Sequence, residues 1–209
     1  DYTVWNPEVD RAIPATYRAS SVIGKGLCKQ ELQAQMGLQE DATVPLFGII
    51  CRLTEQKGTA LMREVLPQAL EQMQMQLVVL GSGAPHDEPF FRELAATAPG
   101  RVGIDIGYNE ELAHRIEAGA DFFLMPSLFE PCGLSQLYAM RYGALPVVHA
   151  TGGLEDTVEQ YNEGEGTGTG FKFYHADAST FLGTIGWAVG TWYDRPSHIT
   201  QMRELAMAQ

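Results

Sequence analysis

The sequence predicts an α/β fold built on a mainly parallel sheet with helices on both faces. Two observations carry this prediction. Short continuous apolar runs recur along the chain, as expected of strands that are buried on both faces. Each run is followed by a segment with helical spacing of its apolar residues, at the interval of a βαβ unit.

Six apolar runs are expected to form the strands. The first is VPLFGII, a short run without a charged residue, and the last is GTGFKFY. Runs of this length and composition are typical of strands in the centre of a parallel sheet. The expected strands occupy residues 44–50, 76–81, 101–107, 121–127, 144–150 and 168–174.

The segments between these runs are expected to be helices. Pro67 should interrupt the first of them, because proline cannot donate to the helical ladder. Asn109 is a candidate N-cap, followed by acidic residues in the first turn, where the helix dipole favours them. The expected helices occupy residues 59–72, 88–98, 109–119, 133–143 and 153–161, and two more close the chain.

This alternation predicts a Rossmann-like, doubly wound α/β fold that forms a single domain over residues 1–209. Residues 1–43 are expected to be an irregular lead-in with a polar helical stretch at 27–38. The chain lacks an initiator methionine and opens abruptly. We therefore expect it to be a piece of a longer protein.

Composition argues against two classes of partner. The net charge of −12 does not fit a general binder of nucleic acid or of a membrane surface, which needs a basic face. No segment approaches the ~20 apolar residues of a membrane span. The three cysteines are widely spaced, which indicates reduced thiols in a cytosol-like compartment.

Ligands of doubly wound sheets bind outside the carboxyl ends of the strands, so the loops after the strands are the candidate site. The stretch CRLTEQKG follows the first strand and places Arg52 and Lys57 five residues apart, with Gly58 before a helix. Two cations beside a helix N-terminus make a good diphosphate clamp. Two solvated surface charges are the alternative at this point.

The stretch MPSLFEPCGLSQLYAMRYG follows the fourth strand and carries a single carboxylate, Glu130. The amides of Gly133, Leu134 and Ser135 would open the next helix and favour an anion such as phosphate. A carboxylate beside them could accept hydrogen bonds from sugar hydroxyls. The alternative is that Glu130 caps the helix. Cys132 has no evident partner base and is not expected to be a nucleophile.

Two further loops contribute candidates. Tyr108 follows the third strand, where its ring could stack on a base, and a core or rim tyrosine is the alternative. The turn Thr151–Gly152–Gly153 follows the fifth strand and offers amides to phosphate, or is simply a tight turn that needs glycine. The loop GSGAPH fails the dinucleotide fingerprint, because His86 stands where the third glycine is required.

No metal or cofactor is expected. The five histidines are scattered without H-x-x-x-H spacing, and neither C-x-x-C nor D-x-D occurs. The chain also lacks the G-x-x-x-x-G-K-[ST] motif of P-loop proteins and the G-x-S-x-G motif of serine hydrolases.

With CRLTEQKG, GYNE, MPSLFEPCGLSQLYAMRYG and TGGLEDTV in this order, the chain resembles bacterial glycogen synthases and plant starch synthases. These are retaining glucosyltransferases of family five with the GT-B fold. The resemblance runs from YTVWNP near the start to ELAMAQ at the end. It covers only the C-terminal, donor-nucleotide domain and implies that the N-terminal acceptor domain is absent.

The resemblance implies transfer of glucose from ADP-glucose to an α-1,4-glucan without a metal, the glucan being held through the missing domain. Arg52 and Lys57 look like the pair that neutralises the diphosphate, Glu130 like the essential carboxylate against glucose, and Tyr108 like the ring on adenine. The remaining implied substrate-binding positions are Cys132, Gly133, Leu134, Ser135, Thr151, Gly152 and Gly153. The isolated chain is expected to be inactive, and its compartment to be a bacterial cytosol or a plastid stroma.

Three positions bear on the resemblance. Related GT-B enzymes often carry a second glutamate at position 138, where this branch and this chain have tyrosine. Cys51 stands where glycine or serine is usual, and His149 where an arginine often stands. Two other readings stay open, a nucleotide-binding module that does not catalyse transfer and a GT-B enzyme that uses another nucleotide sugar, such as a UDP-sugar.

Overall fold

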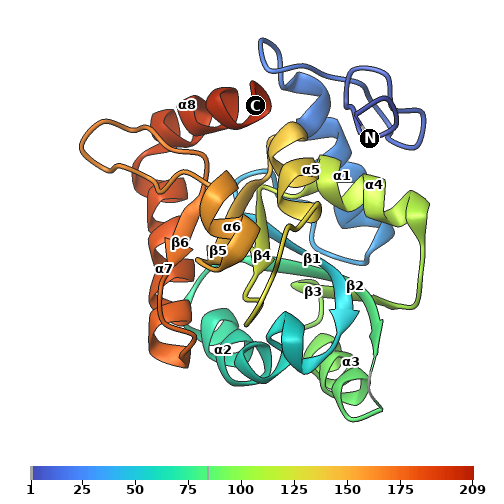
Figure 1. Cartoon of the computed structure of the whole chain (residues 1–209). Helices are drawn as coiled ribbons and strands as arrows, with labels where there is room; N and C mark the ends of the chain where they lie inside the picture. Colours follow the sequence, from blue (N-terminus) through green and yellow to red (C-terminus); the bar gives the residue numbers. More distant parts are fainter. Residues whose placement is uncertain (1, 84) are drawn as a thin grey trace.

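A six-stranded parallel sheet forms the centre of the molecule (Figure 1). The computed structural model describes residues 2–83 and 85–209. The strand order is β3-β2-β1-β4-β5-β6, which confirms the doubly wound, Rossmann-like fold that the sequence predicts. The strands are β1 (Leu46–Leu53), β2 (Gln76–Gly83), β3 (Val102–Ile106), β4 (Phe122–Met125), β5 (Leu145–His149) and β6 (Phe171–Phe173).

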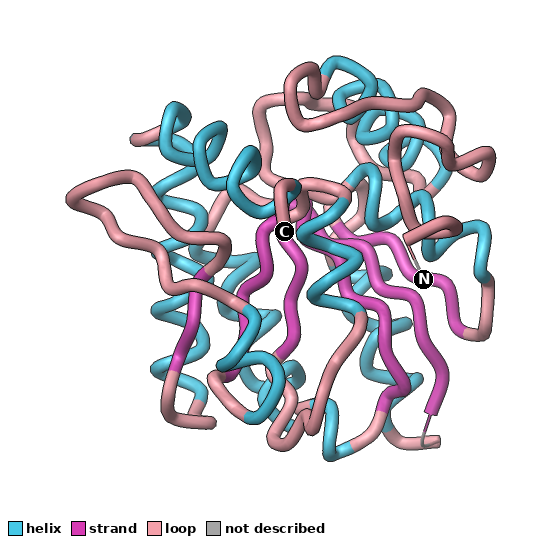
Figure 2. The backbone as a smooth tube through the Cα atoms, turned by 45° about the horizontal axis from the view of Figure 1, so that its top comes forward, coloured by secondary structure: helices cyan, strands magenta, loops and turns pink. Residues whose placement is uncertain are grey.

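Helices cover both faces of the sheet (Figure 2). One face carries α1 (Ile23–Gln35), α4 (Glu110–Gly119), α5 (Ser135–Arg141) and α6 (Gly152–Thr157). The other carries α2 (Thr59–Gln72), α3 (Asp87–Thr97), α7 (Ala178–Asp194) and α8 (Pro196–Met207). None of the helices in the described part of the chain combines the length and the apolar character that crossing a membrane requires.

Strand β1 continues past its predicted end at residue 50 to Leu53. The reason is that β2 runs beside it to Gly83, so that Arg52 pairs in register with Ser82. Arg52 therefore lies in the strand itself, and Lys57 lies in the short 3₁₀ helix η1 (Glu55–Lys57) that follows. Ala84, in the loop that fails the dinucleotide fingerprint, lies outside the described residues.

The helices match the prediction with three corrections. Helix α1 covers Ile23–Gln35, where the sequence predicts a helical stretch at 27–38. Helix α2 runs through Pro67 without interruption. Pro67 is exposed, so water can donate a hydrogen bond to the carbonyl that the missing proline N–H leaves without a donor. Helix α6 ends at Thr157, short of the predicted residue 161. Asn109 is the N-cap of α4, as expected, and its side chain accepts a hydrogen bond from the Leu112 amide at 3.0 Å.

The segment before α1 is irregular, as predicted, but it is packed firmly onto α4 and α5. The Asp10 carboxylate accepts a hydrogen bond from the Tyr142 hydroxyl at 2.6 Å and lies 2.7 Å from Nδ1 of His114. The Trp5 ring stacks on His114 at 3.8 Å and on Tyr138 at 4.6 Å between centroids. Residues far apart in sequence thus fix this segment in place.

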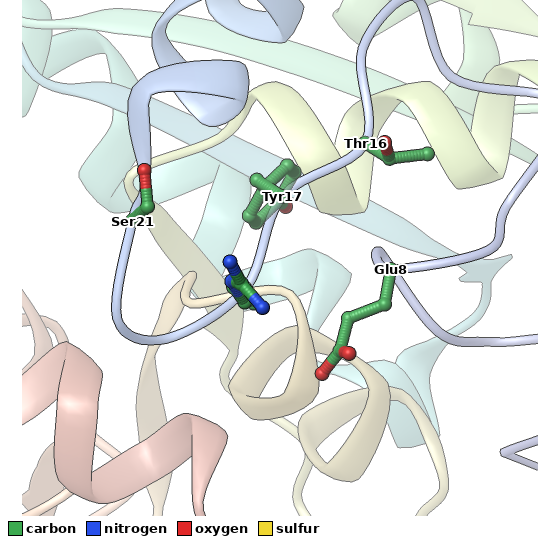
Figure 3. A pocket seen from close by; sticks show the side chains of 5 residues that line it. Glu8, Thr16, Tyr17 and Ser21 are labelled. Carbon is green, nitrogen blue, oxygen red and sulfur yellow. The ribbon is translucent and has the colours of Figure 1, made fainter.

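A cavity of about 320 Å³ lies beside this segment (Figure 3). The Tyr17 hydroxyl donates to the Tyr142 carbonyl at 2.8 Å, just before the amino end of β5. The cavity is therefore on the edge of the sheet opposite the strand ends that carry the predicted site. Its lining residues are Glu8, Thr16, Tyr17, Arg18 and Ser21.

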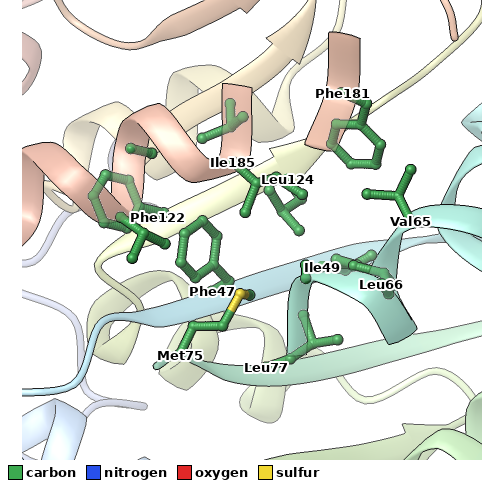
Figure 4. Packing of buried hydrophobic residues seen from close by; sticks show 14 of the residues in the cluster. Phe47, Ile49, Val65, Leu66, Met75, Leu77, Phe122, Leu124, Phe181 and Ile185 are labelled. Carbon is green, nitrogen blue, oxygen red and sulfur yellow. The ribbon is translucent and has the colours of Figure 1, made fainter. Parts of the chain in front are cut away.

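Alternating strand residues fill two apolar layers, one on each face of the sheet. Phe47 and Phe122, on the adjacent strands β1 and β4, stack at 4.8 Å between ring centroids. Figure 4 shows how strand residues of this layer meet α2 and α7, through Phe47, Ile49, Leu77, Phe122 and Leu124 against Val65, Leu66, Phe181 and Ile185. The opposite layer includes Leu46, Val78, Phe123, Leu32 and Ile116.

A basic residue of α1, Lys25, and an acidic residue of α4, Glu117, are both buried where these helices meet. The Lys25 ammonium donates to the Ala118 carbonyl at 2.9 Å, and burial lowers the pKa of Lys25 to about 7. Glu117 is also buried, and its Oε2 has no hydrogen-bond partner among the described residues. Burial raises the pKa of the Glu117 carboxyl well above its ordinary value, and the Lys25 charge offsets this only in part.

Glu117→Gln should become more stable relative to the wild type as the pH rises from about 5 to 7. The unfolded chain loses the Glu117 proton near pH ~4.3, whereas the folded chain retains it, so wild-type stability falls by at most about 1.4 kcal/mol per pH unit in this interval. Glutamine has no proton to lose. Urea unfolding at pH 5, 6 and 7 measures the difference, with Glu71→Gln, the same change at an exposed position, as the control. A Glu117→Gln difference that stays constant with pH would contradict this assignment.

Candidate functional site

A cavity of about 200 Å³ opens at the carboxyl ends of β1 and β4. We call it the β1–β4 cavity. Three of the predicted site residues line it, namely Arg52, Lys57 and Ser135. The other lining residues are Ile50, Cys51, Met62, Leu124, Met125, Pro126 and Ser127. The structure thus brings the two predicted cations to one site, although they belong to different secondary-structure elements.

Glu130 is joined directly to Lys57. The Lys57 ammonium donates to Oε2 of Glu130 at 2.5 Å, and the Ser127 hydroxyl donates to the same oxygen at 3.3 Å. Glu130 is only 8% exposed. The alternative in which Glu130 caps the next helix is wrong, because α5 begins at Ser135 and its N-cap residue is Leu134.

The loops after β1 and β4 are held together by their backbones. The Leu128 amide donates to the Gln56 carbonyl at 2.9 Å, and the Gln56 side-chain amide donates to the Phe129 carbonyl at 3.2 Å. Gly58 has φ 83°, and a Cβ there would lie 2.1 Å from the Pro126 carbonyl oxygen. Only glycine allows this close approach, which sets the distance between the two loops.

The turn after β5 supports the same loop from its other side. The Gly153 amide donates to the carbonyls of Glu130 at 3.0 Å and Pro131 at 3.2 Å. A Cβ on Gly153 would lie 2.0 Å from the Cys132 carbonyl oxygen. The Gly153 amide is thus engaged by this loop, and the absence of a side chain at Gly153 allows the close backbone approach.

Gln136 is a site residue that the sequence did not reveal. It is fully buried, and its side-chain amide donates to the carbonyls of Cys132 and Gly133 and to the Thr157 hydroxyl, at 3.1 to 3.2 Å. Its Oε1 has no partner among the described residues. Gln136 ties the loop after β4 to α6. A polar residue one position inside a helix carries no local signal of this task.

A second cavity, of about 240 Å³, adjoins the first. We call it the β1–β3 cavity, and it shares Ile50, Cys51 and Arg52 with the β1–β4 cavity. Tyr108 lines it and is 89% exposed, so the core alternative for this tyrosine is wrong. Its ring stands at the rim, where a flat ligand can reach it. The remaining lining residues are Leu80, Gly81, Ser82, Gly107, Asn109 and Ala113.

Two positions that depart from the family pattern lie close to the cavities. Burial raises the pKa of the Cys51 thiol to about 12, so the thiol stays protonated at neutral pH. His149 lies at the end of β5, and its Nδ1 is 2.7 Å from the Ser127 carbonyl oxygen. Because a carbonyl only accepts, Nδ1 carries a proton and donates it. His149 thereby holds the residue that donates to Glu130.

The other predicted residues surround the site without lining either cavity. Cys132 and Leu134 are exposed in the loop before α5, and Thr151 and Gly152 open α6. Gly133 lies next to the buried Gln136 side chain. Among the described residues, no group of three or more histidine, cysteine, aspartate or glutamate side chains has an arrangement that could hold a metal ion.

Comparisons with known proteins agree on the family. The profile described as "Glycosyl transferases group 1" matches residues 30–185. Glycogen synthase 1 of Geobacter metallireducens is 49% identical over 209 residues, covering 100% of this chain and 41% of that protein. Glycogen synthase of Geobacillus thermodenitrificans is 49% identical over 207 residues, covering 99% of this chain and 42% of that protein.

A solved structure of the catalytic domain of starch synthase IV from Arabidopsis thaliana, bound to ADP and acarbose, is also similar. It superposes with a TM-score of 0.93 at 34% identity, over 100% of this chain and 44% of that chain. The resemblance that the sequence motifs indicate is therefore confirmed. The chain spans about two fifths of the length of the curated relatives it matches.

Gly153→Ala should destabilise the chain by about 1–3 kcal/mol, because the added Cβ meets backbone that cannot move aside without shifting Glu130. The matched control is Gly183→Ala in α7, where a Cβ meets nothing within 4 Å and should stabilise the helix by about 0.5–1 kcal/mol. Urea unfolding of both variants measures these changes. Equal stability of the two variants would mean that the turn after β5 does not support the loop.

Proposed function

Because the chain belongs to the group 1 glycosyl transferases and matches bacterial glycogen synthases over its whole length, we propose that it is the donor-binding part of a retaining glucosyltransferase. The reaction would transfer glucose from ADP-glucose to an α-1,4-glucan. The observation that carries the proposal is that Arg52 and Lys57 line one cavity at the carboxyl edge of the sheet and that Glu130 is paired with Lys57 there.

The two adjoining cavities suit the two ends of a nucleotide sugar. Arg52 lines both, so a diphosphate beside Arg52 would have its base in the β1–β3 cavity and its sugar in the β1–β4 cavity. The exposed Tyr108 ring would stack on adenine. Glucose would lie near Glu130, whose carboxylate can accept hydrogen bonds from sugar hydroxyls. The ADP in the similar Arabidopsis structure supports an adenine diphosphate as the ligand class.

The chemistry asked of these residues is stabilisation of charge. As the bond between glucose and the diphosphate breaks, negative charge grows on the leaving group. Arg52 and Lys57 would neutralise that charge by hydrogen bonds to the phosphate oxygens, and no metal takes part in this proposal. Glu130 would orient the glucose, and Ser127, Gln136 and His149 would hold the loop that presents it.

Calorimetric titration of this chain should show ADP binding and much weaker UDP binding. Arg52→Ala should weaken ADP binding by roughly 10- to 100-fold, since a charge-assisted hydrogen bond contributes about 1.5–3 kcal/mol. Arg11→Ala removes the same charge from an exposed position that lines neither cavity and is the control, with ADP affinity unchanged.

Equal affinity for ADP and UDP would favour a GT-B enzyme with another nucleotide sugar. An Arg52→Ala variant that binds ADP as tightly as the Arg11→Ala control would remove Arg52 from the site.

The 209-residue chain alone should not extend glucan from ADP-glucose, because the acceptor would be held by a part of the protein that this chain does not include. Incubation with radiolabelled ADP-glucose and glycogen measures this, with a whole glycogen synthase as the positive control. Incorporation of label by the chain alone would show that the acceptor site lies within it. A whole protein that binds ADP but transfers no glucose would favour the non-catalytic module.

A further inference from the structure

The ion pair of Lys57 and Glu130 joins two groups to which the proposed function gives different ligands. Lys57 is assigned to the diphosphate and Glu130 to the sugar, yet their charged atoms lie 2.5 Å apart. Their side chains are only 20% and 11% exposed, so water screens this pair less than a pair at the surface. In the structure, the Lys57 ammonium and the Glu130 carboxylate are each other's charge partner.

Arg52 differs from Lys57 in this respect. It is exposed, and among the described residues no carboxylate lies within 4 Å of it in an ion pair. A diphosphate therefore finds one cation available and one already neutralised. To gain the charge of Lys57, it has to compete with the Glu130 carboxylate, which is an anion of similar hydrogen-bonding capacity.

We propose that Glu130 is an internal competitor of the donor diphosphate, and that diphosphate binding transfers Lys57 from Glu130 to the phosphate oxygens and frees Glu130 for the sugar. This inference rests on the proposed function. It assigns Glu130 a role in donor binding that precedes its contact with glucose. It also makes the readiness of Glu130 depend on the presence of the diphosphate.

The exchange requires movement of side chains only. The backbone of Glu130 is fixed by the Gly153 amide, and the two loops are fixed to one another by the bond from the Leu128 amide to the Gln56 carbonyl. Lys57 has a flexible stem and three donor hydrogens, so it can turn from one acceptor to another without moving the loop. The Ser127 hydroxyl lies 3.3 Å from the oxygen that Lys57 would leave and stays as its partner.

If the ion pair had only a structural role, different results would be expected. If the pair only joined the two loops, removing either charge would weaken the fold and leave the affinity for ADP unchanged or reduced. If Glu130 competes with the diphosphate, removing its charge must increase that affinity, and the increase must depend on Lys57.

A double-mutant cycle tests this dependence. ADP is titrated calorimetrically into the wild-type chain, Glu130→Gln, Lys57→Met and the double variant. We expect Glu130→Gln to bind ADP roughly tenfold more tightly than the wild type, and Lys57→Met roughly tenfold or more weakly. In the Lys57→Met background, the Glu130→Gln substitution should change the affinity by less than about twofold.

Glu55→Gln is the matched control. It removes the same charge from the same short segment as Lys57, at an exposed position, and should leave the affinity near that of the wild type. A gain from Glu55→Gln as large as that from Glu130→Gln would mean that the general negative field, and not the pair, limits binding. An equal gain with and without Lys57 would overturn the proposal in the same way.

A measurement on the wild-type chain guards against variants that fail to fold. With ¹³C-labelled glutamate, the Glu130 carboxyl signal, identified by its loss in Glu130→Asp, should shift on addition of ADP, whereas the Glu55 signal should not. A Glu130 signal that ignores saturating ADP would overturn the exchange. A wild-type chain that does not bind ADP at all would instead overturn the proposed function, so the two failures are distinct.

Discussion

The order of the strands is the constraint on which the site depends. In the order β3-β2-β1-β4-β5-β6, the chain leaves β1 toward one edge of the sheet and later returns through β4 to build the other edge. The loops after the neighbouring strands β1 and β4 therefore lead away from each other along a line at the carboxyl edge of the sheet. In open sheets of this kind, a crevice forms where the strand order reverses. Lys57 and Glu130 are 73 positions apart in sequence and meet there. The β1–β4 cavity and the two cations lie at this line, and the β1–β3 cavity with the exposed Tyr108 adjoins it through Arg52.

Backbone contacts give the crevice its shape. Glycine at two places, Gly58 and Gly153, lets main chain approach main chain, once between the loops after β1 and β4 and once between the loop after β4 and the turn after β5. His149 and Gln136 add side-chain bonds to carbonyls of that same loop. Lys57 and Glu130 thus stand on loops whose backbone is held in place by close contacts and hydrogen bonds. Pre-organisation of this kind is what electrostatic stabilisation requires.

The sequence was sufficient for the strands and for placing Arg52, Lys57, Tyr108 and Ser135 at the cavities, because a strand buried on both faces is a continuous apolar run and ligands bind at its carboxyl end. It was insufficient where tertiary contacts decide. β1 extends through the polar residues Cys51 and Arg52 because β2 is beside it, and no local pattern shows this. The pairing of Lys57 with Glu130 depends on which strands are neighbours. The role of Gln136 depends on two carbonyls and a hydroxyl that only the folded loop brings together.

The pairing of β1 with β4 also bears on how the chain folds. Neighbours β1–β2, β2–β3, β4–β5 and β5–β6 are consecutive in sequence, whereas β1 and β4 are joined across two intervening strands. Each half of the sheet, β1–β3 and β4–β6, can therefore assemble from contacts that are close along the chain, while joining them closes a long loop at a greater entropic cost. The crevice lies on the seam between these halves. The β1–β3 cavity belongs to the first half alone, whereas the β1–β4 cavity, with residues from both halves, can form only once the two halves have joined.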